Sequence, residues 1–376
     1  MRVMIIAGEA SGDQHSARLV EAVHNLDPSV EFFGIGGECM RRAGVEILVD
    51  SSEMAVVGLV EIWAHRKVIF GALDKMREIL KTDPPDLLFL TDYPEFNLRL
   101  AKTAKQLGIK VLFYISPQIW AWRQWRVKKI RKLVDMMAVI FPFELDFYHR
   151  HNVPVRFVGH PLAEEVHASA EREHLCTEFG LNAQQPVVGL FPGSRQSEVK
   201  RLMPIIVETA KQLKQQNPQI QFLLPVASTL KHEIFSPYID AETPPITMIE
   251  NRSYDVMAAC DAIVTVSGTV TLEIALIGTP MVIINRISAL SYFIAKRMVK
   301  IDHIGLCNIV AGKRVVPELI QYDVKAKKIA DEIIRMLTQP EYNQSIRNEL
   351  QQVRAKLSSD GEVSDLAELT MELLKQ

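Results

Sequence analysis

The chain has 376 residues, more than one hydrophobic core usually supports, so its length predicts two or three domains. Apolar residues make up 48% and charged residues 23%, proportions that exclude a disordered, collagen-like or coiled-coil chain. The net charge of −2 argues against a nucleic-acid binder with a uniformly basic surface, so an anionic ligand must meet a local basic patch.

The cysteines and the first apolar run indicate the cellular compartment in which the protein is expected. Cys39, Cys176, Cys260 and Cys307 are far apart and form no Cys-x-x-Cys pair, which predicts neither a zinc site nor a disulfide framework. The run 3–7 is too short for a signal peptide, and no stretch has the roughly 20 apolar residues of a membrane span. We therefore expect a cytoplasmic protein, with peripheral membrane contact left open.

Short apolar runs bounded by turn residues alternate with segments of helical spacing. The predicted strands are 3–7, 32–35, 87–90, 110–115, 136–141 and 155–158 and, after a polar stretch at 163–185, 187–191, 222–226, 246–249, 262–266 and 281–284. Only helices are predicted from residue 324 onward. Continuous apolar strands between helices are typical of parallel sheets covered on both faces. The predicted fold class is α/β, with two Rossmann-like domains, 1–170 and 171–376, facing a cleft.

Ligands of open α/β sheets bind where strands end and loops enter helices, so these loops are the candidate sites. The loop after the first strand contains Glu9, Ser11 and Gly12 and opens a helix. Such a loop suits an anion or a sugar hydroxyl, and a plain helix cap explains it equally well. The loop 34–39 begins like a dinucleotide-binding fingerprint, but Cys39 replaces its third glycine, which disfavours a nicotinamide enzyme.

Two carboxylates and an amide follow the strand 87–90. They are Asp92, Glu95 and Asn97, and Pro94 stiffens the turn that holds them. A carboxylate at this edge is placed to remove a proton from a bound hydroxyl, which makes Asp92 the candidate base. Asn97 is a candidate ligand contact, although capping the next helix is its simpler role.

Three of the four tryptophans, Trp120, Trp122 and Trp125, fall within six residues, and basic residues follow them. Aromatic and cationic side chains together suit nucleic acid or an anionic membrane surface, with a solvated helix face as the alternative. Upstream, the apolar segment 54–70 is core or, where exposed, a lipid-contacting ridge. The residues predicted to contact a membrane are Val57, Trp63, Trp122, Trp125, Arg126, Lys128 and Lys129.

The strand 187–191 leads into Gly193, Ser194 and Arg195, the strongest local phosphate signal in the chain. Backbone N–H groups of such a loop can wrap a phosphate, and a guanidinium can contact its oxygens in bidentate fashion. Whether the following helix begins before Pro204 or at it stays open at this stage.

The strand 262–266 leads into Ser267, Gly268 and Thr269, and Glu273 follows about one helical turn later. Its carboxylate suits the two hydroxyls of a ribose, and stabilisation of the helix N-terminus is the competing explanation. The chain has neither a Walker lysine nor a run of metal-binding aspartates. We therefore expect a nucleotide diphosphate held by backbone and arginine, with no metal and no cofactor.

Together, the motifs at 8–13, 92–97, 116–123, 159–161, 192–195, 267–273 and 308–312 resemble the lipid-A-disaccharide synthase family, in order and over nearly the whole chain. The resemblance implies the GT-B glycosyltransferase fold and an inverting transfer of 2,3-diacylglucosamine from UDP-2,3-diacylglucosamine to 2,3-diacylglucosamine 1-phosphate (lipid X). The implied products are the β(1→6) lipid A disaccharide 1-phosphate and UDP, in lipid A (lipopolysaccharide) biosynthesis. It also implies a peripheral place on the cytoplasmic face of the inner membrane, and a homodimer stays open.

The resemblance implies residue roles as well. Asp92 is the general base for the acceptor 6-hydroxyl, Arg195 holds the diphosphate, and Glu273 holds the ribose. The implied acceptor-binding residues are Glu9, Ser11, Gly12 and Asn97, and the implied donor-binding residues are Gly193, Ser194, Arg195, Ser267, Gly268, Thr269, Glu273 and Asn308. Two positions depart from the family: Glu95 replaces a second aspartate, and Cys307 replaces a proline.

Two other functions compete with this interpretation. An isomerase of the UDP-N-acetylglucosamine 2-epimerase type shares the fold and binds UDP, but it handles a soluble sugar and needs no lipid surface. A non-enzymatic RNA-binding protein would use the tryptophan-rich helix, with an affinity that falls steeply with salt and ignores UDP. The net charge of −2 and the two phosphate loops oppose RNA binding, so no nucleic-acid partner is expected.

Overall fold

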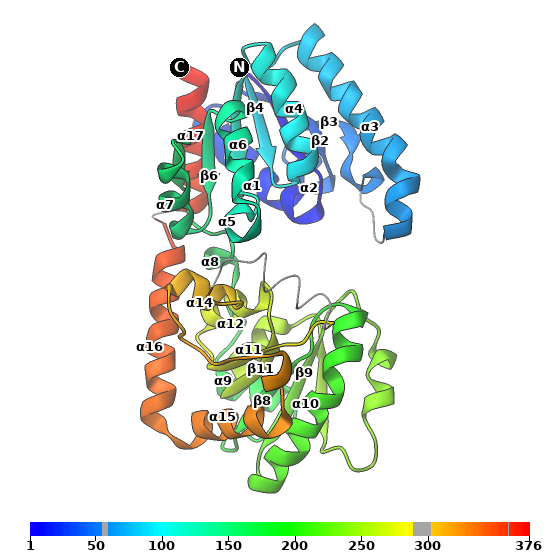
Figure 1. Ribbon diagram of the computed structural model, residues 1–376, viewed down its shortest axis with the longest axis vertical. Coiled ribbons are helices and arrows are strands. Elements are labelled where there is room, and N and C mark those ends of the chain that lie inside the picture. Colours follow the sequence, from blue (N-terminus) through cyan, green and yellow to red (C-terminus); the bar gives the residue numbers. More distant parts are fainter. Residues whose placement is uncertain (55–58, 289–301, 360) are drawn as a thin grey trace. The chain divides into compact units, whose positions relative to one another are not determined.

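The computed structural model describes residues 1–54, 59–288, 302–359 and 361–376, which form two compact units. The first unit contains Met1–Pro161 and Leu357–Gln376, and the second contains Leu162–Lys356. Each unit has one parallel sheet with helices on both faces (Figure 1). The predicted α/β class with two Rossmann-like domains is therefore confirmed.

The sheet of the first unit has seven strands in the order β3-β2-β1-β4-β5-β6-β7, all paired in parallel. They are β1 (Arg2–Ala7), β2 (Glu31–Gly36), β3 (Glu46–Asp50), β4 (Leu87–Thr91), β5 (Lys110–Tyr114), β6 (Met136–Val139) and β7 (Val155–Phe157). Every residue of β4 is buried, as in a strand covered on both faces.

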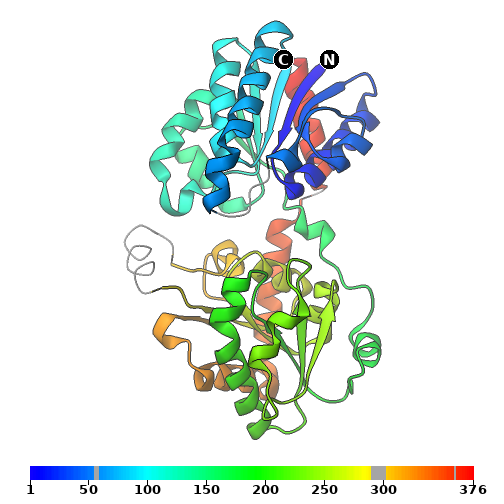
Figure 2. The same ribbon diagram turned by 90° about the vertical axis from the view of Figure 1, so that its right-hand side faces the viewer.

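The helices of the first unit lie in two layers. They are α1 (Ala10–Leu26), α2 (Glu38–Arg42), α3 (Leu59–Thr82), α4 (Pro94–Gln106), α5 (Ile119–Trp122), α6 (Val127–Leu133), α7 (Pro142–Arg150) and α17 (Glu362–Lys375), with the 3-10 turns η1 (Ser51–Glu53) and η2 (Gln124–Arg126). Helices α1 and α17 pack together on one face, and α4 packs between α3 and α6 on the other (Figure 2).

The sheet of the second unit has the order β10-β9-β8-β11-β12-β13. Its strands are β8 (Val187–Phe191), β9 (Gln221–Val226), β10 (Ile246–Glu250), β11 (Ala262–Val266), β12 (Met281–Asn285) and β13 (Glu318–Ile320). Its helices are α8 (Leu162–Glu165), α9 (Arg172–Glu178), α10 (Gln196–Gln216), α11 (Ser253–Ala259), α12 (Val270–Ile277), α14 (Leu306–Ala311), α15 (Ala326–Thr338) and α16 (Pro340–Leu357), with the 3-10 turns η3 (His232–Ile234), η4 (Ser236–Tyr238) and η5 (Gln321–Asp323). Helix α10 begins before Pro204 and contains it.

The sequence does not predict the two strands β3 and β13. Both lie at the edge of a sheet, and most of their residues are partly exposed. An edge strand needs no continuous apolar run, so the pattern that identifies the inner strands is weak there.

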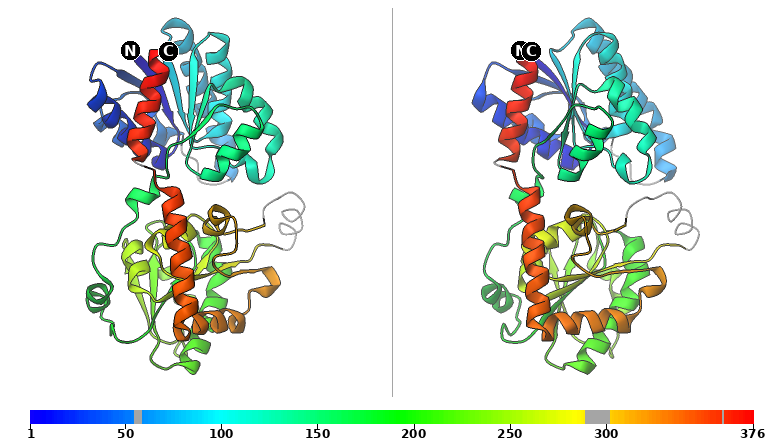
Figure 3. Two further views of the ribbon diagram at one scale, coloured as in Figure 1. Left: turned by 90° about the vertical axis from the view of Figure 1, so that its left-hand side faces the viewer. Right: turned by 60° about the vertical axis from the view of Figure 1, so that its left-hand side comes forward.

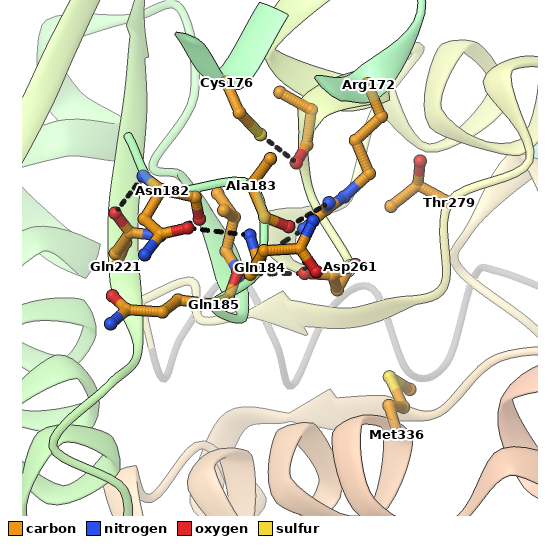
Figure 4. A network of polar contacts seen from close by, with 12 residues as sticks. Arg172, Cys176, Asn182, Ala183, Gln184, Gln185, Gln221, Asp261, Thr279 and Met336 are labelled. Carbon is orange, nitrogen blue, oxygen red and sulfur yellow. Dashed lines mark hydrogen bonds and ion pairs between the residues drawn. The ribbon is translucent and has the colours of Figure 1, made fainter. Parts of the chain in front are cut away.

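The polar stretch 163–185 is fastened to the second sheet. Arg172 forms an ion pair of 2.7 Å with Asp261 and donates a hydrogen bond to the carbonyl of Ala183 (Figure 4). The same Asp261 carboxylate accepts a hydrogen bond of 2.9 Å from the backbone N–H of Val187, at the start of β8. These contacts make the stretch part of the second unit from Leu162 onward, earlier than the predicted boundary at 170.

The C-terminal helix belongs to the first unit, whereas the sequence assigns it to the second domain. Helix α17 packs on α1, and α16 lies along the second unit (Figure 3). Lys110 donates a hydrogen bond of 3.0 Å to the carbonyl of Leu373, and Arg156 pairs with Glu372 at 2.8 Å. Helical periodicity predicts that a segment is helical and amphipathic, but it does not specify which sheet the apolar face covers.

Candidate active site

The strand order of each sheet reverses at one point, which is where ligands of open α/β sheets bind. In the first unit this point lies between β1 and β4, and in the second unit between β8 and β11. The predicted loops follow these four strands. Each unit therefore carries one candidate site at its switch point.

In the first unit, the loop after β1 contacts the turn after β4. A Cβ atom at Gly8 would lie 2.6 Å from the ring of Tyr93, so only glycine lets the two segments approach this closely. Ser16 Oγ and Thr91 Oγ1 are hydrogen-bonded at 2.8 Å beneath them. The structure thus brings the loop of Glu9, Ser11 and Gly12 next to Asp92 as predicted from the strand ends.

The turn that presents Asp92 has an unusual backbone. Asp92 and Tyr93 have φ angles of 44° and 43°, in the left-handed region that side chains other than glycine rarely adopt. Ile115, which follows the neighbouring strand β5, has φ 62°. Strained residues persist where the surroundings fix them and cluster at functional sites, so this edge is a candidate site on backbone geometry alone.

Asn97 holds this turn from the inside. Its amide group donates hydrogen bonds to the carbonyls of Asp92, at 2.7 Å, and Thr91, at 3.2 Å, and its side chain is fully buried. The amide nitrogen of Asn97 thus supports the Asp92 turn. Its buried Oδ1 atom has no hydrogen-bond partner among the described residues, so the contact with the acceptor stays a prediction.

The surroundings of Asp92 shift the pKa of its carboxyl. Burial, reinforced by the negative charge of Glu9, raises its pKa to about 6, while a backbone hydrogen bond lowers it slightly. A base with a pKa just below neutral is mostly ionised at pH 7 and still binds a proton readily. Asp92 as the general base stays a prediction, and a carboxyl with this pKa could fill that role.

The glycine-rich loop 34–39 leads into α2, and a side chain from α1 caps the N-terminus of α2. The Asp13 carboxylate accepts hydrogen bonds from the backbone N–H groups of Gly37 at 2.6 Å, Cys39 at 3.0 Å and Met40 at 3.2 Å. These are the donors that a dinucleotide phosphate would need. The loop therefore has a structural role in joining α1 to α2.

In the second unit, seven of the eight predicted donor residues line one pocket of about 370 Å³. Its lining includes Gly193, Ser194 and Arg195 after β8, and Ser267, Gly268, Thr269 and Glu273 after β11. The N-terminal turns of α10 and α12, where the helix dipole is positive, lie at the same strand ends. The positive helix ends favour an anionic ligand, which would replace the Glu198 carboxylate as the acceptor for the N–H groups of Ser194 and Arg195.

Glu198, which the sequence analysis missed, holds the first of these loops. Its carboxylate accepts hydrogen bonds from the N–H groups of Ser194 at 3.1 Å and Arg195 at 3.2 Å. The Arg195 side chain remains 80% exposed, with its guanidinium 3.6 Å from the same carboxylate. Arg195 cannot accept a hydrogen bond as the Ser or Thr of a capping box does, so the sequence holds only half of that signature, a glutamate three residues after the N-cap.

Glu273 lies in the first turn of α12 and lines the pocket. Burial raises the pKa of its carboxyl. Ser267, at the opposite end of the loop, donates a hydrogen bond of 2.8 Å to the carbonyl of Ile304. A desolvated carboxylate beside a braced loop is a strong acceptor for ligand hydroxyls.

Asn308 does not line this pocket, which corrects its predicted role. Its side chain is fully buried, accepts hydrogen bonds from the N–H groups of Val315 and Val316, and donates one of 2.8 Å to Glu318. The Glu318 carboxylate in turn binds the N–H groups of Ile304 and Gly305. Through Glu318, Asn308 thus supports the backbone of Ile304, whose carbonyl accepts the hydrogen bond from Ser267.

The tryptophan-rich segment has buried and exposed parts. Trp120 is buried against Phe143, whereas Trp122 and Trp125 are 44% and 72% exposed. Lys128 and Lys129 are also exposed. Arg126 is only 12% exposed because it pairs with Glu95 at 2.7 Å, so it faces α4 and is less available to a membrane than predicted.

The upstream ridge is described only in part. Val57 lies outside the described residues, and Trp63 lies on α3 in a stretch whose side chains are not described. Farther along α3, Val68 and Phe70 are 39% and 38% exposed. No described helix is long and apolar enough to cross a membrane, and no three His, Cys, Asp or Glu side chains of the described ranges gather as a metal site requires.

Two units, each with a parallel sheet and ligand loops at its switch point, have the architecture of the GT-B fold, which glycosyltransferases and UDP-sugar epimerases share. The glycotransferase of kitacinnamycin matches with a TM-score of 0.66 at 14% identity, covering 99% of this chain and 98% of that one. The UDP-GlcNAc 2-epimerase from Neisseria meningitidis bound to UDP-GlcNAc matches with a TM-score of 0.63 at 11% identity, covering 100% of both chains. At such identities these likenesses show the fold alone.

A family model described as lipid-A-disaccharide synthetase matches residues 3–370. The chain is 56% identical over 375 residues to a lipid-A-disaccharide synthase of Trichlorobacter lovleyi, across 100% of this chain and 98% of that protein. The chain belongs to the lipid-A-disaccharide synthetase family and is a glycosyltransferase. The epimerase alternative, which shares only the fold, is not favoured.

Proposed function

We propose that the chain transfers 2,3-diacylglucosamine from UDP-2,3-diacylglucosamine to lipid X, forming the β(1→6) lipid A disaccharide 1-phosphate and UDP. The name of the Trichlorobacter lovleyi relative, lipid-A-disaccharide synthase, supports the disaccharide product. The strongest support is that the chain has two sites. The first unit has Asp92, whose carboxyl has a pKa of about 6, and the second unit has a pocket lined by two loops that could bind phosphate.

The second unit is the proposed donor site. Arg195, which is exposed at the pocket, would contact the diphosphate, and Glu273 would accept hydrogen bonds from the ribose hydroxyls. The positive ends of α10 and α12 would stabilise the charge that develops on the departing UDP. Asn308 would act indirectly, through Glu318 and the backbone beside Ser267.

The first unit is the proposed acceptor site, with Glu9, Ser11 and Gly12 around the sugar and Asp92 as base. Asp92 would take the proton of the 6-hydroxyl as that oxygen attacks the anomeric carbon of the donor. The bond from the anomeric carbon to the phosphate oxygen breaks, and its electron pair leaves with UDP. One displacement from the face opposite the leaving group inverts the anomeric centre, and a single base suffices for it.

A peripheral contact with the cytoplasmic face of the inner membrane would deliver both acylated substrates. The exposed Trp122, Trp125, Val68 and Phe70 lie on the first unit with the exposed cations of α6. Each such cation near an anionic surface contributes about 1 kcal/mol to the free energy of membrane binding. Replacing Lys128, Arg131 and Lys132 with glutamate should therefore weaken binding to anionic vesicles, and unchanged co-sedimentation at low salt would contradict the membrane contact.

Product analysis tests the reaction itself. Purified protein, incubated with both substrates in neutral micelles, should yield UDP and disaccharide in equal amounts, with NMR couplings of a β(1→6) linkage. An isomerase would instead return a UDP-sugar changed at carbon 2, with no disaccharide. Either that result or a different linkage would contradict the proposal.

A further inference from the structure

Four cationic side chains that the mechanism above does not use converge on the first unit. They are Arg99 and Lys102 of α4, Arg126 of η2 and Lys129 of α6, here called the basic cluster. Helices α4 and α6 pack against each other (Figure 1). Desolvation lowers the pKa of Lys129, and the positive charges of Arg126, Arg99 and Lys102 lower it further. The four charges are thus close enough to repel one another.

One carboxylate accompanies the basic cluster. Glu95 pairs with Arg126 at 2.7 Å, and the Glu95 side chain is 67% exposed whereas that of Arg126 is 12% exposed. One acid against four cations leaves an excess of positive charge at a single place, although the whole chain is slightly negative. A local excess of positive charge attracts anions, which makes the basic cluster a candidate anion site.

The position of the basic cluster relates it to the acceptor. Glu95 lies in the first turn of α4, three residues after Asp92. At 1.5 Å per residue, Lys102 lies only about 12 Å along the helix from its start at Pro94. The α4 residues of the basic cluster thus lie within just over two helical turns of the turn that presents Asp92.

Apolar side chains border the basic cluster. The guanidinium carbon of Arg99 lies 5.4 Å from the ring centre of Phe70, which is itself 38% exposed. Trp125, next to Arg126 in the chain, is 72% exposed. An anion bound here would have exposed apolar surface at its side, as suits a phosphate carried by a lipid.

We propose that the basic cluster binds the phosphate monoester of the lipid acceptor and thereby sets the preference for a phosphorylated acceptor. The inference rests on the proposed function, because it takes the first unit as the acceptor site. A phosphate dianion offers the oxygens that a guanidinium contacts in bidentate fashion, so it replaces Glu95 on Arg126. The neighbouring cations then neutralise its second charge.

The test compares two acceptors that differ only in the phosphate, lipid X and the same diacylglucosamine without it, in micelles of a neutral detergent. The wild-type protein should prefer lipid X in kcat/KM. The double variant Arg126→Gln, Lys129→Gln should lose roughly ten- to hundredfold in kcat/KM for lipid X, as for a charge-assisted contact, and little for the other acceptor. Lys81→Gln, the same change on an exposed cation of α3 that has no part in either proposed site, should keep the wild-type preference.

The double variant also removes the ion pair between Arg126 and Glu95, which could destabilise the first unit. A second variant therefore leaves this ion pair intact. Lys102→Gln changes an exposed side chain and should lower the preference for lipid X in the same direction. UDP affinity, measured by calorimetry, should stay unchanged in every variant. A preference that survives in both cluster variants overturns the inference, as does an equal loss with the two acceptors.

Vesicles of phosphatidylglycerol separate the acceptor phosphate from bilayer headgroups. If the cluster variants lose vesicle binding while keeping the preference for lipid X in neutral micelles, the cluster serves headgroups and the inference is wrong. A wild-type protein that transfers to neither acceptor contradicts the proposed function instead. A wild-type protein that transfers to both equally contradicts only this inference.

Discussion

The side-chain amide of Asn97 donates a hydrogen bond of 2.7 Å to the backbone carbonyl of Asp92, so a fully buried residue of α4 fixes the turn that presents the proposed base. A second bond, to the carbonyl of Thr91, holds the end of β4 in the same way. The left-handed backbone at Asp92 and Tyr93 is therefore maintained by an interaction from inside the fold.

Asn97→Ala should separate this support from ligand binding. The variant removes a hydrogen bond to the buried carbonyl of Thr91 and another to the partly buried carbonyl of Asp92, at a cost of about 1 to 3 kcal/mol of unfolding free energy for a group left unsatisfied. The value of kcat should fall because the Asp92 turn relaxes, and UDP affinity should not change. Chemical denaturation and steady-state kinetics measure both effects, and a kcat within twofold of wild type would contradict the supporting role.

Asp92→Asn should lower kcat by a factor of about 10² to 10⁴, the usual contribution of a positioned base. The amide keeps the size of the side chain but cannot accept the proton of the acceptor hydroxyl. UDP binding to the second unit should remain as in the wild type, which serves as the control for folding. Activity within tenfold of wild type would remove Asp92 from the mechanism.

The pH profile should report the ionisation of Asp92. Because its pKa is raised to about 6, kcat/KM should rise with pH through a midpoint near 6 and level off above it, where the carboxylate is ionised. The negative charge of Glu9 contributes to the rise, after burial. Glu9→Gln should therefore move the midpoint to lower pH, and a midpoint that does not move would show that another group titrates.

Arg195→Lys tests the phosphate loop. Lysine keeps the charge but loses the planar pair of N–H donors, so UDP affinity should weaken by roughly 1 to 3 kcal/mol. The matched control is Arg201→Lys on the same helix, since Arg201 donates to the carbonyl of Arg286 and is not a lining residue of the pocket. If calorimetry gives equal UDP affinity for wild type and Arg195→Lys, Arg195 does not contact the diphosphate and the diphosphate site lies elsewhere.

The inner strands and the ligand loops could be predicted because their signals are local. A strand such as β4 is buried on both faces and is therefore apolar throughout, and the loops at its end are polar and rich in glycine. The edge strand β13 has only three residues and begins with Glu318, whose carboxylate serves a neighbouring segment. Its pattern resembles that of a loop.

The roles of Asn97 and Asn308 could not be predicted, because an amide in a loop and an amide inside the fold read alike in a sequence. What distinguishes them is the backbone that surrounds each one, the carbonyls of Thr91 and Asp92 in the first case and the N–H groups of Val315 and Val316 in the second. Those partners are brought together by tertiary packing. The helix α17 shows the same limit, since its partner α1 lies at the other end of the chain.

The central claim is that one chain joins a UDP-bound sugar to a lipid acceptor. The most direct test is a coupled assay of UDP release with both substrates, with the donor alone and with lipid X alone, on wild-type protein and on Asp92→Asn. We predict release only when donor and lipid X are both present, and a release slower by about 10² or more in the variant. Equal release from the donor alone, or none with both substrates, would contradict the claim.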